Sequence, residues 1–201
     1  KTDIFVMWFK ILIACIPAMI YGIFLDDIIE PYLYNATTVA IMLILFGAAF
    51  IIIENWNKGK KPKVNSLAAL TYKDALIIGL FQLIAAIFPG TSRSGATIVG
   101  ALLIGVSRVI AAEFTFFLAI PVMFGASFLK LVKFFIKGNA LTGPQIFYTI
   151  LGMLVAFGVS VYSIQFLMGY VRRHDFKSLV IIVLFLGIVV LAYFGITALA
   201  S

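Results

Sequence analysis

Long apolar runs separated by short polar stretches fill most of the chain. A helix that crosses the hydrocarbon core of a bilayer needs about 20 predominantly apolar residues, within a range of about 17 to 25. Runs of this length predict five membrane-spanning helices, at residues 4–25, 36–53, 109–135, 145–168 and 179–200. The pattern indicates an all-α protein, a polytopic membrane helix bundle.

A different pattern occupies residues 74–106, where two shorter apolar runs flank a polar turn. The runs at 74–88 and 96–106 are each too short to cross ~30 Å of hydrocarbon as a helix. We expect a re-entrant helical hairpin, in which one helix enters the membrane, the chain turns at depth and a second helix returns. The residues that make the turn polar or tight are Pro89, Gly90, Thr91, Ser92, Arg93, Ser94, Gly95 and Thr97.

The polar stretches between the runs predict the orientation of the chain. Residues 58–65 carry four lysines, at 58, 60, 61 and 63, and the positive-inside rule places such a loop in the cytoplasm. The acidic stretch at 26–31 is then expected to be a short loop outside. Lys130, Lys133 and Lys137 fall on the outer side in this topology, which weakens the charge bias without reversing it.

Composition supports a membrane protein with a single integral domain over residues 1–201. The chain is 64% hydrophobic and 11% charged, whereas soluble domains are about 25% charged. The net charge of +7 needs no nucleic-acid partner, because basic loops orient membrane proteins. One cysteine and one histidine, Cys15 and His174, argue against a zinc site.

The chemistry of the polar turn predicts a site for a phosphate-like group. An arginine at membrane depth is costly and normally marks a site, and the start of the second helix presents free N–H groups and a positive dipole end. The planar guanidinium of Arg93 matches phosphate oxygens in pairs. The hydroxyls of Ser92, Ser94 and Thr97 could add donors, with the backbone at Gly90, Thr91 and Gly95 completing the site.

Two points about this turn stay open in the sequence. Ser92, Ser94 and Thr97 could merely cap the helix while Arg93 reaches lipid headgroups. Glu113 could pair with Arg93 or with Arg108, or could lie at the membrane interface.

The residues around the turn resemble a known family. Residues 79–98 read Gly-Leu-Phe-Gln-Leu-Ile-Ala-Ala-Ile-Phe-Pro-Gly-Thr-Ser-Arg-Ser-Gly-Ala-Thr-Ile, which is similar to the second signature of the undecaprenyl-diphosphate phosphatases, also called bacitracin resistance proteins. The resemblance continues through 105–108, 111–114 and 119–121, and 13–18 is similar to a family helix. It implies hydrolysis of undecaprenyl diphosphate to undecaprenyl phosphate and phosphate. This reaction recycles the lipid carrier of cell-wall synthesis and gives bacitracin resistance.

The resemblance also implies an architecture and a place. Family members are inverted repeats in the bacterial inner membrane, each half a re-entrant hairpin followed by three spans, with a substrate cavity open to the outer face. On this pattern residues 1–57 are the end of the first half, with two spans. Residues 58–73 are the cytoplasmic loop and 74–201 are the second half.

The family's first signature, a glutamate-rich helix running into Pro-Val-Ser-Ser-Thr-Gly-His, does not occur in the sequence, and Lys1 stands where a full chain would begin with Met. We therefore expect a fragment or a trimmed chain. The resemblance implies that this signature supplies the nucleophile, the histidine and the glutamates that hold a divalent cation, Mg²⁺ or Ca²⁺, so no metal ligand is expected here. It assigns Arg93, Ser92, Ser94 and Thr97 to the catalytic site, with Gln82 and Glu113 as candidate supporting residues. We expect the chain alone to be inactive or nearly so.

A second class of function fits the same features. A membrane transporter or flippase for a phosphate-bearing lipid or an anion would use a broken helix in the same way. A structural membrane subunit would leave Arg93 unexplained. The sequence leaves the oligomeric state open, a homodimer included.

Overall fold

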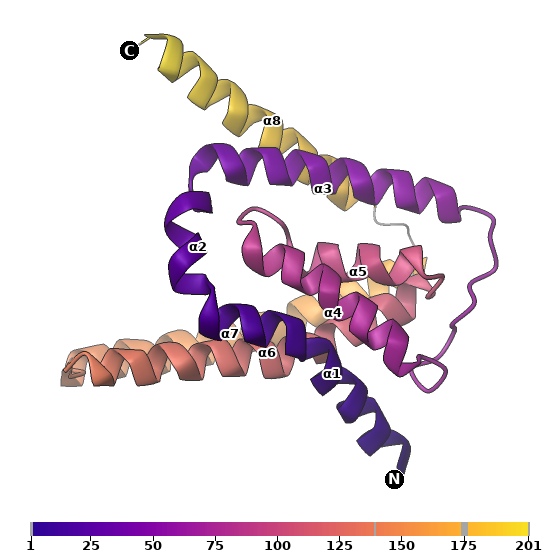
Figure 1. Cartoon of the computed structure of the whole chain (residues 1–201), viewed down its shortest axis with the longest axis horizontal. Helices are drawn as coiled ribbons and strands as arrows, with labels where there is room; N and C mark the ends of the chain where they lie inside the picture. The colour runs from indigo at the N-terminus through magenta and orange to yellow at the C-terminus, as the bar shows by residue number, and fades with distance from the viewer. Residues whose placement is uncertain (1, 139, 174–176, 201) are drawn as a thin grey trace.

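A computed structural model describes residues 2–138, 140–173 and 177–200. Within these residues the regular structure is helical, apart from one isolated bridge between Val64 and Val106. Figure 1 shows the helices in order: α1 (Thr2–Phe24), α2 (Asp26–Leu33), α3 (Ala36–Asn57), α4 (Tyr72–Ile87), α5 (Arg93–Leu103), α6 (Arg108–Ile136), α7 (Gly143–Arg173) and α8 (Lys177–Ala200). The predicted all-α architecture is confirmed. His174 lies outside the described residues.

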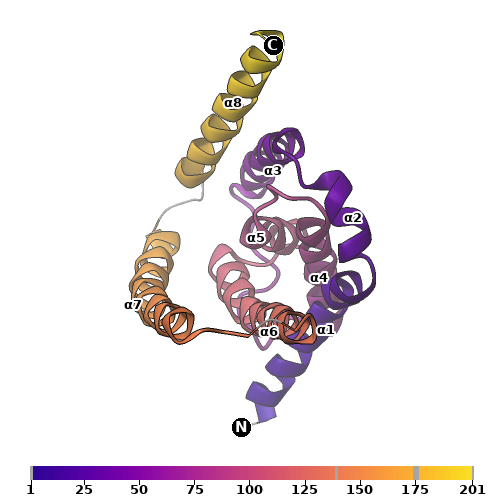
Figure 2. The ribbon, with the colours of Figure 1, turned by 90° about the vertical axis from the view of Figure 1, so that its left-hand side faces the viewer.

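The hairpin of α4 and α5 lies at the centre of the molecule. α4 has 16 residues and α5 has 11, which correspond to lengths of about 24 Å and 17 Å and leave both helices short of the ~30 Å hydrocarbon core. Figure 2 shows α5 between α3, α4 and α6, and the side chains of α5 from Ala96 to Leu102 are buried. The two short helices therefore have the geometry of a re-entrant hairpin.

Local sequence signals fix where these two helices begin. The Thr71 hydroxyl accepts from the Asp74 amide at 3.1 Å while the Asp74 carboxylate accepts from the Thr71 amide at 2.9 Å, which is a capping box at the start of α4. The Ser92 hydroxyl accepts from the Gly95 amide at 3.2 Å and caps α5. α5 thus begins one residue before the expected region at 94–97.

Close backbone packing holds the hairpin against α1. A Cβ atom at Gly79 of α4 would collide with the backbone of Ala14 of α1. Only glycine allows the two helices to approach this closely. Ala14, Ala75 and Ile78 are fully buried at this contact region of the core.

The lysine loop between α3 and α4 is tied to the far end of the hairpin. The amides of Lys63 and Val64 donate to the Gly105 carbonyl at 2.8 and 3.3 Å, and the Ser107 amide donates back to the Val64 carbonyl at 2.9 Å. Lys10 of α1, which is 6% exposed, donates to the carbonyl of Ala68 in the same loop at 3.1 Å. We call this end of the molecule, where the lysine loop meets the end of α5 and the start of α6, the basic end.

The end of the molecule opposite the basic end carries α2, and its structure differs from the loop expected there. Residues 26–33 form a helix, not a loop, and Asp26 and Asp27 lie in its first turn. Carboxylates are stabilising there because they lie near the positive end of the helix dipole. The Asp27 carboxylate accepts from Lys133 Nζ at 2.8 Å, which joins α2 to the last turns of α6. We call this the acidic end; it brings the acidic stretch to Lys133 of α6.

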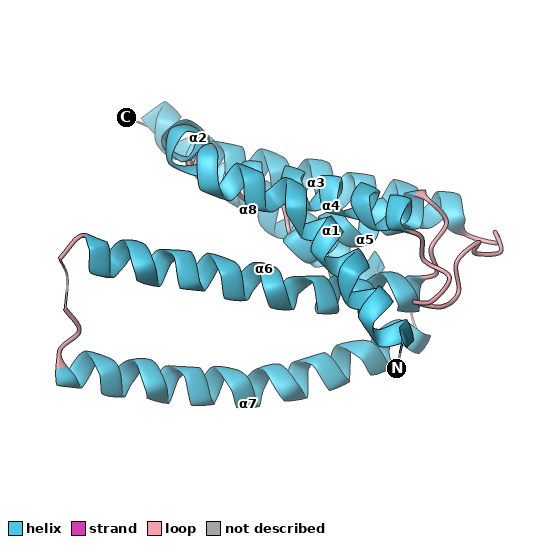
Figure 3. Ribbon diagram, turned by 60° about the horizontal axis from the view of Figure 1, so that its bottom comes forward, coloured by secondary structure: helices cyan, strands magenta, loops and turns pink. Residues whose placement is uncertain are grey.

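Four described helices are long and apolar enough to span a membrane: 4–24, 36–57, 108–136 and 143–172. They confirm a polytopic membrane bundle. Figure 3 shows α6 and α7 running side by side as two long rods. The fifth expected span coincides with α8, whose described apolar part runs from Val180 to Ala192; its crossing, like the division into repeat halves, stays a prediction.

Candidate functional site

The turn between α4 and α5 is tight because of Pro89 and Gly90. Gly90 has a φ of +87°, a conformation that residues with a side chain rarely adopt. A Cβ at this position would also collide with the carbonyl of Val39 in α3. The tip of the hairpin therefore packs against the first turns of α3. Glycine is needed at position 90 both for its positive φ and for this close contact.

The start of α5 offers a cluster of polar groups at this tip. The Ser92 and Ser94 hydroxyls lie 3.3 Å apart, and both residues are exposed. Ser92 caps the helix, so part of the capping interpretation is confirmed. The amides of Arg93 and Ser94 precede the first intrahelical donors of α5 and are placed to bind an anion.

A mostly apolar cavity of about 190 Å³ opens beside these hydroxyls. Its polar end is formed by Gly90, Ser92, Ser94 and Gly95. Hydrocarbon from α3, α5, α6, α7 and α8 forms its walls, with Leu43, Phe46, Phe50, Ile98, Phe116, Leu167 and Val180 among the lining residues. The hydroxyls and the helix start thus meet an apolar space.

Arg93 does not line this cavity. Its side chain is half-buried and lies within electrostatic reach of Tyr34, at the acidic end. Burial raises the pKa of the Tyr34 phenol, the charges of Asp26 and Glu30 raise it further, and the positive charge of Arg93 acts in the opposite direction. The structure therefore places Arg93 and the two serines on different faces at the start of α5. It also brings Tyr34 into the surroundings of Arg93, a residue that the sequence did not single out.

Thr97 is engaged inside the bundle. It is 1% exposed, its hydroxyl lies 3.0 Å from the carbonyls of Arg93 and Ser94, and the Thr115 hydroxyl of α6 donates to it at 3.0 Å. In this arrangement the Thr97 hydroxyl joins α5 to α6. Its expected contact with a phosphate stays a prediction.

Two buried polar groups near the turn have no hydrogen-bond partner within the described part of the chain: Nε2 of Gln82, on α4, and Oγ1 of Thr91. Gln82 is 1% exposed and Thr91 is 7% exposed. Because a buried donor without a partner is costly, these atoms are available for a partner that the described residues do not supply.

The carboxylates pair differently from both of the pairs considered for Glu113. Glu54 of α3, which is 1% exposed, forms an ion pair with Arg108. Glu113 Oε1 lies 4.0 Å from Nη2 of Arg172. The expected Glu113–Arg108 pair is not among the ion pairs of the described residues, where Arg108 pairs with Glu54. Among the described residues no carboxylate forms an ion pair with Arg93.

The residues present do not form a complete site for a divalent cation. Within the described ranges, no three side chains of His, Cys, Asp or Glu gather closely enough to hold a metal ion. Mg²⁺ and Ca²⁺ are bound in proteins mainly through carboxylate and carbonyl oxygens, and serine hydroxyls alone are a poor substitute. The expected cation stays a prediction, and no step is derived through it.

Comparison with known proteins places these features in a family. The family model described as bacitracin resistance protein BacA matches residues 1–189. An undecaprenyl-diphosphatase of Desulfitobacterium hafniense is 60% identical over 195 residues, covering 97% of this chain and 69% of the relative. Undecaprenyl-diphosphatase 1 of Clostridium acetobutylicum is 60% identical over 194 residues, 96% of this chain and 70% of the relative. An undecaprenyl-diphosphatase of Enterococcus faecalis is 53% identical over 191 residues, 95% of this chain and 68% of the relative.

Proposed function

The chain belongs to the family of the bacitracin resistance protein BacA, and from this premise we propose that it takes part in the hydrolysis of undecaprenyl diphosphate. Water cleaves the bond between the two phosphate groups, so that undecaprenyl phosphate and inorganic phosphate are released. The reaction would recycle the lipid carrier of cell-wall synthesis and reduce the target available to bacitracin.

The observation that carries this proposal is the cavity at the start of α5. It joins two serine hydroxyls and a helix start to a wall of hydrocarbon, within a hairpin too short to cross the membrane. A lipid diphosphate has the same two parts, an anionic head and an apolar tail. The diphosphate would bind at the first turn of α5, with the prenyl chain along Phe46, Phe50 and Phe116.

Arg93 would act on the phosphate from the other face of the helix. Phosphoryl transfer develops charge on the equatorial oxygens, and a guanidinium that neutralises it lowers the barrier. For Arg93 to reach the same diphosphate as Ser92, the substrate must bridge the two faces at the tip. Thr97 would hold α5 against α6 so that this tip keeps its shape, and Gln82 and Thr91 would offer further donors.

The chain would supply the phosphate-binding part of the site and depend on another segment for the chemistry. No histidine or carboxylate stands within the turn to activate Ser92 or Ser94. About 30% of each relative named above lies outside the region matched by this chain. We place the nucleophile, its base and the ligands of the divalent cation in that region, and we place the protein in the bacterial inner membrane with the basic end in the cytoplasm.

The test is release of phosphate from undecaprenyl diphosphate in detergent with Mg²⁺. The chain is compared with the same chain joined to the upstream segment of the Desulfitobacterium hafniense relative. We expect activity only from the joined form. Hydrolysis by the chain alone would place the nucleophile among its own hydroxyls and overturn this division of roles.

The second candidate, a transporter or flippase for a phosphate-bearing lipid, is supported by the same short helix with its positive end at depth. The chain alone and the chain joined to the upstream segment are each reconstituted into liposomes with a fluorescent polyprenyl diphosphate in one leaflet. Movement of the lipid without phosphate release would favour transport. Phosphate release without movement would favour the phosphatase.

A further inference from the structure

A second and larger cavity lies at the basic end, at the other end of α5 from the polar turn, and the two cavities share Val171 in their linings. It has a volume of about 750 Å³ and is bounded by the lysine loop, the end of α5 and the start of α6. Six basic side chains line it against one acidic side chain, Glu54. The basic residues are Lys58, Lys60, Lys61, Lys63, Arg108 and Arg172.

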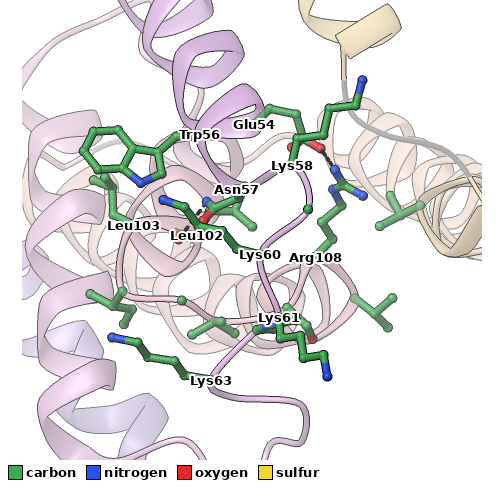
Figure 4. Close-up of a pocket in the computed structure, with 18 of the residues that line it drawn as sticks. Glu54, Trp56, Asn57, Lys58, Lys60, Lys61, Lys63, Leu102, Leu103 and Arg108 are labelled. Carbon is green, nitrogen blue, oxygen red and sulfur yellow. Dashed lines mark hydrogen bonds and ion pairs between the residues drawn. The ribbon is translucent and has the colours of Figure 1, made fainter.

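The lysines are held around this space by the fold. The Lys63 and Val64 amides donate to the Gly105 carbonyl, and Asn57 Nδ2 donates to the Leu102 carbonyl at 3.0 Å. The stretch that carries the four lysines is therefore anchored on both sides, at the last turn of α5 and at the turn that follows α5. Figure 4 shows the four lysines projecting from this anchored loop around the cavity.

Glu54 and Arg108 form the floor of the cavity. Glu54 is buried and ion-paired with Arg108, as Figure 4 shows. The Arg108 side chain is still 40% exposed, and a guanidinium has five N–H donors. One pair with Glu54 therefore fixes the position of Arg108 while leaving donors that face the cavity.

Apolar surface borders the charged part of the cavity. Trp56 is 67% exposed and Leu103 is 52% exposed, and both line the cavity. Lys60 Nζ lies 4.6 Å from the centre of the Trp56 ring. An ammonium group over an indole beside exposed leucine is a surface suited to a molecule with an anionic head and an apolar tail.

We propose that this basic cavity binds the phosphate group of an anionic membrane lipid, with the lipid's acyl chains against Trp56 and Leu103. Basic pockets between membrane helices on the cytoplasmic side are suited to anionic headgroups. The ligand is held by its charge and undergoes no reaction there. The site goes beyond the proposed hydrolysis and is tested by binding alone, so the two can fail separately.

The experiment measures lipid binding by native mass spectrometry of the purified chain in detergent. Phosphatidylglycerol and phosphatidylcholine are titrated separately, and inorganic phosphate is added as a competitor. The variant Lys60→Gln with Lys61→Gln removes two charges from the cavity. The matched control is Lys130→Gln with Lys137→Gln, which removes two exposed charges near the acidic end.

We expect tighter binding of phosphatidylglycerol than of phosphatidylcholine. Because each lysine near an anionic lipid contributes roughly a fivefold factor, the cavity variant should lose about 25-fold in affinity, and the control should lose less than about twofold. Failure of millimolar inorganic phosphate to compete identifies the lipid as the ligand. Full displacement by inorganic phosphate would overturn the lipid assignment and leave a site for free phosphate.

Two further results would overturn the proposal. One is equal affinity for the two lipids. The other is an equal loss in both variants, since diffuse attraction by net charge would then explain the binding. A third variant, Glu54→Gln with Arg108→Gln, replaces the buried ion pair by two neutral amides. It should weaken phosphatidylglycerol binding, and its melting temperature is measured to check that it folds; a folded variant with unchanged phosphatidylglycerol affinity would overturn the proposal.

Discussion

Single residues at the start of α5 have separate tasks, because successive residues of a helix point in different directions. Ser92 and Ser94 face the apolar cavity, whereas Arg93 lies near Tyr34 and Thr97 contacts α6. A substitution at any one of these positions should therefore change a different measurable property. The predictions for Arg93 and Thr97 use that separation.

The guanidinium of Arg93 is expected to matter for its shape as well as its charge. Lysine keeps the charge but cannot form two parallel hydrogen bonds to a phosphate. In the chain joined to the upstream segment, Arg93→Lys should lower kcat/KM by about tenfold, less than full removal of the charge does. The measurement is phosphate release. Equal activity of Arg93→Lys and the unmodified protein would show that only charge is used.

The hydroxyl of Thr97 is expected to position α5 rather than touch the substrate. Thr97→Val leaves the Thr115 hydroxyl without its acceptor, which should lower the free energy of unfolding by about 1–3 kcal/mol. Thr115→Val is the matched control, because it removes the other side of the same hydrogen bond. Similar losses of stability and of kcat/KM in both variants are expected. A much larger loss of kcat in Thr97→Val alone would mean that Thr97 contacts the reacting phosphate.

Among the elements, the hairpin depends on one backbone conformation at its tip. Gly90→Ala forces a side chain into a positive φ and against Val39. The strained backbone alone should lower the free energy of unfolding by about 1–3 kcal/mol, and the collision adds to this.

The control for this hairpin prediction is Gly22→Ala in α1, where a Cβ meets open space and helix propensity favours alanine by up to ~1 kcal/mol. Melting temperatures in detergent compare the two variants. If Gly90→Ala melts at or above the temperature of Gly22→Ala, the tip is not as constrained as the structure indicates.

The pair between α2 and α6 should make stability depend on pH. The hydrogen bond from Lys133, and then its charge, hold the pKa of the Asp27 carboxyl below its usual value. A carboxyl whose pKa is lower in the folded state than in the unfolded state stabilises the protein at pH values above its ordinary pKa of about 4. This stabilisation is lost as the pH falls below 4 and passes the lowered pKa.

Asp27→Asn should therefore lower the melting temperature at pH 7, and the difference from the unmodified protein should shrink as the pH falls below 4. Asp26→Asn is the control, because Asp26 forms no ion pair with the described residues. A difference that is the same at pH 7 and at pH 3 would mean that the Asp27–Lys133 pair does not contribute in solution.

For the whole molecule, the two ends defined by charge predict the orientation in the membrane. Lys61 lies in the exposed lysine loop at the basic end, and Tyr32 of α2 is 79% exposed at the acidic end. In intact cells a membrane-impermeant maleimide should label Tyr32→Cys but not Lys61→Cys, and both should react after the membrane is opened. Cys15 is 8% exposed and should not interfere. Labelling of Lys61→Cys in intact cells would reverse the orientation.

Much of this arrangement follows from the sequence because membrane spans and glycine turns leave local signals. Hydrophobic run length located the helices, and Pro89 and Gly90 located the tip of the hairpin. Other features depend on residues distant in the chain. The pairing of Glu54 with Arg108 and the contact of Thr97 with Thr115 arise from packing between helices. The effect of the Arg93 charge on Tyr34 likewise joins segments that are distant in the sequence. The helix at 26–33 does not follow from the sequence, because Pro31 and three acidic residues are typical of a loop. Two of those acidic residues, Asp26 and Asp27, instead stabilise the first turn of the helix.

The most direct test of the central claim, that the turn at the start of α5 binds the diphosphate through Arg93, is the kcat/KM of Arg93→Ala. It is measured with undecaprenyl diphosphate in the chain joined to the upstream segment, beside the exposed control Lys130→Ala. We predict a loss of about 10²–10³-fold for Arg93→Ala and no change for Lys130→Ala. An Arg93→Ala protein that folds and stays within about twofold of the unmodified kcat/KM would contradict the account.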